Sequence, residues 1–137
     1  MTLTTSYFTV SKHVKGKKIS IARFHLPIIR RGIDEILSSF APSTELLREY
    51  KDGQIDWTQY KRRYTDEQRQ HYREAPEDFE NLLRRSQKED LVLLCYERFE
   101  GPHTKCHRML LINMLKSVAE TTGIKVTFCD EVPYNHK

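Results

Sequence analysis

The sequence has 137 residues with five glycines and five prolines, so it suits one folded domain and excludes a disordered or collagen-like chain. Apolar residues make up 38% and charged residues 31%, which is typical of a polar surface around a modest core. The formal net charge of +4 permits an acidic ligand or a nucleic acid without requiring either one.

The first part of the chain predicts two extended segments. Residues 6–10, SYFTV, are predicted as a short edge strand or an anchored arm, and a turn follows them. Residues 17–25, KKISIARFH, alternate Ile19 and Ile21 with smaller side chains, which is the pattern of a strand. Pro27 ends that strand, because the residue before a proline favours extended backbone and a proline donates no hydrogen bond to a sheet.

The middle of the chain predicts three helices after an ambiguous stretch. Residues 28–42 fit either a short helix or an extended connection that ends at Pro42. The helices begin at residue types that favour a helix N-terminus, and the second and third carry an apolar stripe. The first helix starts at Ser43 and is closed by Gly53. The second starts at Asp56, which forms a capping box with Gln59, and its stripe is Trp57, Tyr60 and Tyr64. The third starts at Pro76, and its stripe is Phe79, Leu82 and Leu83.

The last part predicts a strand, a helix and a second strand. Residues 91–94 are continuously apolar, as in a strand that is covered on both faces. A helix runs from Cys106 to Gly123, and residues 124–129 alternate again. A parallel unit of this kind is right-handed in nearly all proteins. We therefore predict a single α/β domain over residues 1–137, a small three-layer domain with a mostly parallel sheet and flanking helices.

Neither a membrane span nor an export signal is visible in the sequence. The longest uncharged apolar run, LVLLCY, is too short to cross a bilayer, and the first ten residues lack the basic start and apolar stretch of a signal peptide. We therefore expect a cytoplasmic protein with no membrane partner. Its three cysteines, an odd number, are expected to be reduced thiols that pack, bind metal or react.

Chemically active side chains gather where the strand over residues 91–97 leads into the next helix. Ligands of open parallel sheets bind beyond the carboxyl ends of the strands, and this segment occupies that place. Cys106 lies at the predicted helix start, where unpaired N–H groups favour a thiolate or a bound anion. Arg108 adds a planar cation that suits phosphate or carboxylate. The candidates are Cys106, His107 and Glu97 for catalysis, and Arg23, Arg108 and Cys95 for ligand binding.

The leading hypothesis is a pocket for a small anionic ligand, with catalysis through a thiolate left open. A nucleic-acid-binding module is the first alternative, because the helix over residues 57–72 interleaves aromatic and basic residues. The same pattern also fits an amphipathic helix with buried aromatic rings. A metal-binding protein is the second alternative, although the spacing of the ligand types matches no standard zinc site. Those ligand types are Cys95, His103, Cys106 and His107. No cofactor is expected, since no cofactor motif is present, and the oligomeric state does not follow from the sequence.

A strand that ends in Cys95-x-Glu97 and a helix that opens with Cys106-His107-Arg108 resemble the signature of the domain of unknown function 488 family. ISIARFHLP is similar to the family's first strand, in which an arginine precedes a proline, and FAPSTELLREYKDGQIDWTQYKRRY resembles a region of its shorter members. Longer members carry Asp-Val-Arg where this chain has Ile-Ala-Arg, so their carboxylate is missing here. The resemblance implies an α/β fold and a shared pocket, and no established reaction.

Overall fold

A computed structural model of the chain describes residues 1–8, 14–25, 30, 32–95 and 107–129. The described elements in chain order are β1 Thr2–Tyr7, β2 Lys17–Ser20, β3 Glu35–Ile36, the 3-10 helix η2 Ser38–Phe40, α2 Thr44–Lys51, α3 Trp57–Glu74, α4 Pro76–Ser86, β4 Leu91–Cys95, α5 His107–Thr122 and β5 Thr127–Phe128. None of the described helices is both long and apolar enough to cross a bilayer.

The strands form one sheet in the order β3-β2-β4-β1-β5, and every described pair is parallel. Tyr7 pairs with Cys95, and Ser20 pairs with Leu94. The three central strands therefore end together at one edge of the sheet, which is the edge where parallel α/β proteins hold their ligands. The α/β class and the parallel sheet agree with the sequence prediction.

The N-terminal strand differs from its prediction. Residues 6–10 were expected to form an edge strand or an arm, whereas β1 begins at Thr2 and lies inside the sheet between β4 and β5. Its alternating apolar signal is weak because hydroxyl side chains occupy several of its positions, and two of them have partners across the sheet. Thr2 donates to the Asp90 carboxylate from its backbone N–H and its hydroxyl, both at 3.0 Å, and the Thr4 hydroxyl donates to the Cys129 carbonyl at 2.9 Å.

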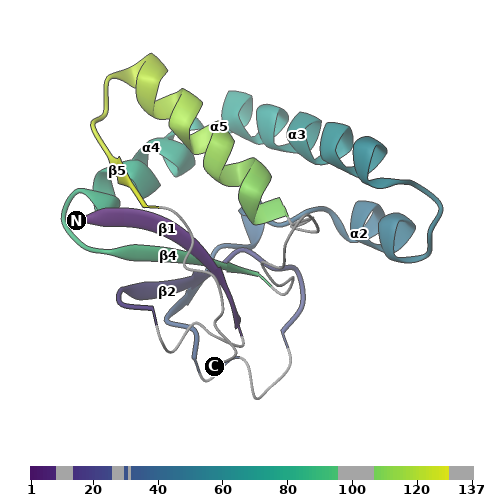
Figure 1. Cartoon of the computed structure of the whole chain (residues 1–137). Helices are drawn as coiled ribbons and strands as arrows, with labels where there is room; N and C mark the ends of the chain where they lie inside the picture. The colour runs from purple at the N-terminus through teal and green to yellow at the C-terminus, as the bar shows by residue number, and fades with distance from the viewer. Residues whose placement is uncertain (9–13, 26–29, 31, 96–106, 130–137) are drawn as a thin grey trace.

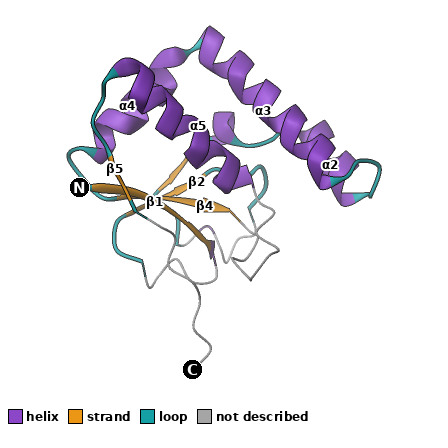
Figure 2. Ribbon diagram, turned by 45° about the horizontal axis from the view of Figure 1, so that its top comes forward, coloured by secondary structure: helices purple, strands orange, loops and turns teal. Residues whose placement is uncertain are grey.

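Helices α3, α4 and α5 lie on one face of the sheet, as Figures 1 and 2 show from two directions. The described residues thus show two of the three predicted layers. The core lies between these helices and the sheet, where buried strand residues such as Leu93 and Ile19 meet Leu83 and Leu115. β4 is buried at all five positions, as its continuous apolar sequence predicted.

The helix starts agree with the residues expected to cap them. The Ser43 hydroxyl accepts from the backbone N–H of Leu46 at the start of α2, and Asp56 and Gln59 form the predicted capping box of α3. Pro76 is the first residue of α4. Residues 32–42 form a connection with a short strand and a 3-10 turn, so the extended alternative for this stretch is correct where it is described.

Candidate functional site

The start of α5 meets the ends of the three central strands. His107 reaches the backbone of Ile21 just after β2, and Arg108 reaches Cys95 at the end of β4 and Tyr7 at the end of β1. We call this group of five residues the carboxyl-edge site. Three of the candidate residues predicted from the sequence, His107, Arg108 and Cys95, therefore lie together.

Arg108 is the largest fully buried side chain among the described residues, with an exposed fraction of 0%. Its Nη1 donates to Cys95 Sγ at 3.1 Å, and its guanidinium carbon lies 5.7 Å from the centre of the Tyr7 ring. A guanidinium stays charged in proteins, so its burial must be offset by electron-rich neighbours. Both of these described contacts are of that kind, a sulfur and an aromatic face.

Cys95 is in a disulfide bond, and its side chain is 1% exposed. This differs from the expectation that all three cysteines are reduced thiols. Cys129 follows that expectation, since it is a free and exposed cysteine near β5. The odd number of cysteines and the missing export signal misled the sequence argument, because neither feature reports how close two sulfurs come in the folded chain.

His107 is held as a buried neutral ring. Its Nε2–H donates to the Ile21 carbonyl at 2.6 Å, and the ring packs against Tyr64 with centroids 5.4 Å apart. Burial, with the nearby charge of Arg108, lowers the pKa of His107 to about 4, although the bond to Ile21 acts in the opposite direction. At neutral pH this imidazole carries no charge, and its described contacts orient the first turn of α5.

Tyr64 supports the carboxyl-edge site from α3, whereas the sequence predicted only a core position for it. Its hydroxyl donates to the Phe40 carbonyl at 2.7 Å, so it joins α3 to η2 while its ring supports His107. Burial raises the pKa of Tyr64 well above its usual value, and so the phenol is a neutral donor. Tyr7 was missed for a different reason: its partnership with Cys95 comes from strand register, which no local pattern reveals.

Arg23 follows β2, two residues beyond the Ile21 carbonyl that accepts from His107. Its Nε donates to the Pro42 carbonyl at 3.0 Å and its Nη2 to the Ser38 carbonyl at 3.2 Å. The side chain is half-buried. Arg23 thus ties the end of β2 to the connection that leads into α2, and its described bonds are to backbone oxygens.

The opposite face of the sheet carries a second polar contact at the same edge. Ser20 Oγ and His25 Nε2 are 2.5 Å apart, and the Ala22 N–H donates to that hydroxyl at 3.2 Å. Ser20 Oγ thus accepts from the backbone of Ala22 and pairs with the ring of His25, which Phe8 meets edge-on. Burial and the charge of Arg30 lower the pKa of His25. This contact fixes the turn after β2.

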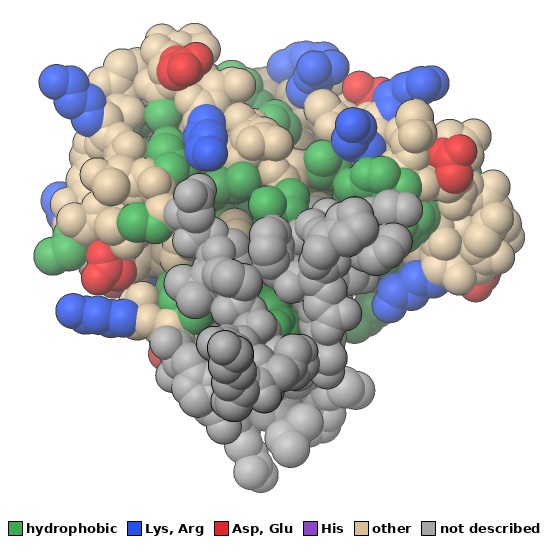
Figure 3. All heavy atoms as spheres, in the orientation of Figure 1, with side chains coloured by type: hydrophobic (Ala, Val, Ile, Leu, Met, Phe, Trp, Pro, Cys, Tyr) green, Lys and Arg blue, Asp and Glu red, His purple; other side chains and the backbone are tan. Residues whose placement is uncertain are grey.

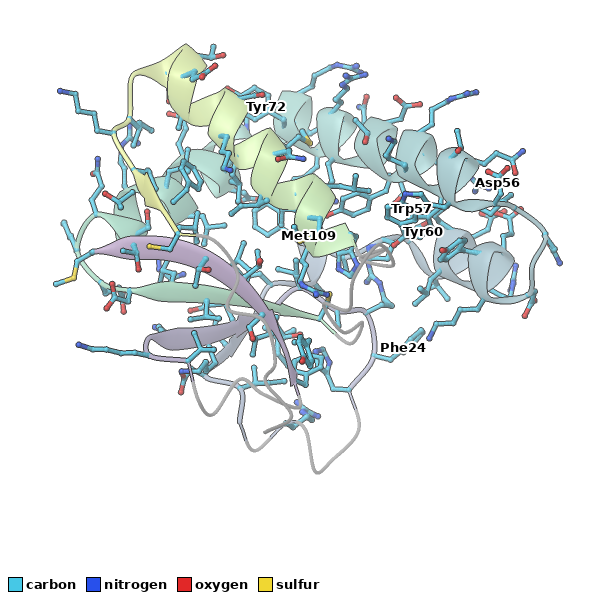
Figure 4. All side chains as sticks on the ribbon, in the orientation of Figure 1. Phe24, Asp56, Trp57, Tyr60, Tyr72 and Met109 are labelled. Atoms are coloured by element: carbon cyan, nitrogen blue, oxygen red, sulfur yellow. The ribbon has the colours of Figure 1, made fainter. Side chains whose placement is uncertain are left out.

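Two candidate catalytic residues, Glu97 and Cys106, lie outside the described residues, as does His103 of the metal hypothesis. Figure 4 labels Met109, the neighbour of Arg108, at the first turn of α5, with Trp57 and Tyr60 at the start of α3. Within the described ranges, no group of three or more His, Cys, Asp or Glu side chains is arranged to hold a metal ion.

The aromatic residues of α3 are largely engaged in the fold. Tyr60 and Tyr64 are buried, and Trp57 stacks on Tyr60 with centroids 5.4 Å apart. On the face that Figure 3 shows, Lys and Arg side chains are scattered around the molecule with Asp and Glu among them. The alternation of rings and basic residues along residues 57–72 is thus the amphipathic helix that the sequence offered as its other explanation.

Comparison with known proteins finds one family. The family profile described as the active DUF488-N3 subclade matches residues 4–119, which includes every described strand and helix from β2 to β4 and most of α5. No curated protein and no solved structure matches the chain.

Proposed function

The chain belongs to the DUF488 family, and we propose that its carboxyl-edge site binds a small anionic ligand. The observation that carries this proposal is the fully buried Arg108 at the start of α5, beside the ends of three parallel strands. A buried guanidinium favours an anion strongly, because low local polarity weakens the screening of its charge. The position supports the same class of ligand, since helix N-termini and the carboxyl edges of parallel sheets both hold anions.

The residues divide into contact and orientation roles in this proposal. Arg108 and Arg23 contact the anion, with Cys95 in the lining, and Cys106 supplies a reactive or ligating thiol. His107 and Glu97 orient the site or handle protons. The contacts of His107 favour a role in orienting the site. Its Nε2–H donates to a backbone carbonyl, and its pKa of about 4 keeps the ring neutral. The description of the subclade as active supports catalysis without naming a reaction.

Phosphate titration tests the binding proposal. Inorganic phosphate is added to the reduced protein while the backbone amide resonances of the first turn of α5 are followed by nuclear magnetic resonance. We expect saturable shifts there, and Arg108→Lys is expected to weaken binding roughly tenfold because it loses the guanidinium fork. Arg62→Lys on the exposed face of α3 is the matched control and should leave binding unchanged. Shifts that never saturate, or that Arg62→Lys weakens equally, contradict the proposal.

Thiol reactivity tests the catalytic part. In the reduced protein, Cys106 at neutral pH is expected to react with iodoacetamide faster than a cysteine of the urea-unfolded chain, because a helix N-terminus stabilises thiolate. The Cys106→Ser variant identifies the labelled residue. Equal rates in the folded and unfolded chain would remove the activated thiol from the proposal and leave anion binding in place.

The two alternative functions have less support among the described residues. Nucleic-acid binding through residues 57–72 would rest on basic side chains alone, because the rings of this helix are packed. Metal binding would use His107 through its other nitrogen, since Nε2 donates to Ile21. A cytoplasmic location and a single domain over residues 1–137 remain our proposals, and the fold described above is compatible with both.

A further inference from the structure

We propose that a groove between the C-terminal half of α5 and β5 binds an amphipathic carboxylate, a molecule with an apolar body and one carboxylate group. The groove has a volume of about 550 Å³, which is in the range of small-molecule sites. We call it the α5–β5 groove, and its lining includes Lys116, Ala119, Gly123, Ile124, Val126 and Phe128. It is separate from the carboxyl-edge site, because Lys116 lies about 12 Å along the helix from Arg108.

Small residues leave the space for this groove. Ala119 lies in the last turns of α5, and Gly123 follows the end of the helix four positions later. A Cβ added at Gly123 would meet no atom within 4 Å. With its φ of +75°, Gly123 begins the segment that returns from α5 to the sheet, as Figure 1 shows. The residues of this returning segment line the groove together with the helix.

The returning segment supplies an apolar wall. Ile124, Val126 and Phe128 pack against the hydrophobic core and are half-buried, so each keeps part of its surface in contact with water. β5 is an edge strand, and none of the described strands pairs with its outer side. Figure 3 shows hydrophobic side chains at the surface beside α5 and β5, with Lys or Arg side chains near them. An apolar ligand body would remove this surface from water.

The charges of the lining favour an anionic head group. The Nζ of Lys116 lies 5.7 Å from the centre of the Phe128 ring, so its charge is held over the apolar wall. This described contact is with a neutral ring, which leaves the ammonium charge without neutralisation from that partner. Lys125 adds a second positive charge to the lining and Glu120 one negative charge, which leaves a net charge of +1. A single carboxylate balances that charge.

The negative groups of the groove determine how the ligand lies. The last carbonyls of α5 carry partial negative charge, and Glu120 is in the same last turn. Both repel a carboxylate, whereas Lys116, one turn earlier, attracts it. The head group therefore lies near the Phe128 ring, and the apolar body lies along Val126 and Ile124.

Octanoate and octan-1-ol test the proposal, because they share one chain and differ in charge. Each is added to the full chain at neutral pH while the amide resonances of residues 116–128 are followed by nuclear magnetic resonance. We expect saturable shifts with octanoate and about threefold weaker binding of octan-1-ol, since a carboxylate–lysine pair near water contributes little more. Octylamine, a cation at this pH, should bind more weakly still. Octanoate shifts that do not approach saturation by about 10 mM, or equal binding of the three molecules, would overturn the proposal.

Two variants separate the head group from the apolar wall. Lys116→Gln should weaken octanoate binding about threefold and leave octan-1-ol binding unchanged, and Lys61→Gln on the exposed face of α3 is the matched control. Val126→Thr keeps the shape of the side chain but replaces a methyl with a hydroxyl, so it should weaken both ligands about threefold. Equal weakening of both ligands by Lys116→Gln, or no effect of Val126→Thr, would contradict the assignment. The comparison of ligands on the wild type decides the question if a variant fails to fold.

The α5–β5 groove and the carboxyl-edge site are tested separately. Saturable octanoate binding without phosphate binding would reject the anion ligand of the carboxyl-edge site and keep this inference, and the reverse result would do the opposite. Phosphate should leave octanoate binding unchanged. Competition between the two would show that they share one site, and it would overturn the separate groove.

Discussion

The buried neutral His107 predicts how stability changes with pH. Its pKa is lowered from 6.5 to about 4 in the folded chain, chiefly because burial disfavours the charged ring. Below pH 6.5, His107 therefore becomes protonated in the unfolded chain while it stays neutral in the folded chain. The free energy of unfolding falls as the pH falls for this reason. The stabilisation is fully present above pH 6.5 and is lost progressively down to about pH 4.

The size of the effect follows from the shift. At 1.36 kcal/mol per pKa unit, the loss from His107 is about 2 kcal/mol between about pH 7.5 and about pH 5, and about 3 kcal/mol by about pH 4. Urea unfolding of the wild type and of His107→Gln, under one redox condition, measures it. The variant keeps an amide N–H for the Ile21 carbonyl but does not titrate, so its stability should change less over this range.

The difference between the two pH profiles isolates His107 from other groups. His25 also has a lowered pKa and contributes in the same range, and the lowered pKa values of Glu35 and Asp90 contribute in more acid solution. These three residues are common to both proteins and cancel in the difference. Parallel profiles for wild type and His107→Gln would show that His107 is not neutral and buried, and the geometry of the carboxyl-edge site would have to be revised.

Four further substitutions, one of them a control, test local features of the fold by urea unfolding. Gly16→Ala should destabilise the chain by about 2 kcal/mol or more, because φ is +135° and the new Cβ would lie 2.9 Å from a backbone oxygen. Gly53→Ala is the control. It also has a positive φ, +76°, but its new Cβ meets no atom within 4 Å, so this substitution should cost less. Equal losses at the two glycines would show that the close contact is absent. Tyr64→Phe should cost about 1–2 kcal/mol, since it leaves the buried Phe40 carbonyl without its donor, and an unchanged midpoint would contradict this bond. Asp56→Ala should cost about 1 kcal/mol through the lost helix cap, and a neutral effect would show that the capping box contributes nothing.

Local features were readable from the sequence because their causes are local. The capping hydroxyl of Ser43, the Asp56–Gln59 box and the proline that opens α4 act within one helical turn, so their residue types alone predict the helix starts. The continuous apolar run of β4 likewise predicted a strand buried on both faces. The family resemblance agrees with the family profile over residues 4–119, and α5 begins at the ends of the central strands, where the sequence predicted that the candidate side chains gather.

The sequence by itself thus determined the α/β class, most helix boundaries and the residues to inspect. Only the tertiary structure decided that β1 lies inside the sheet and that Tyr7 stands beside Cys95, because a strand's neighbours are set by pairing with segments far along the chain. It also decided that Arg108 is fully buried and that His107 is neutral. Burial and charge state depend on what surrounds a side chain from every direction, and that environment is created by packing between distant segments.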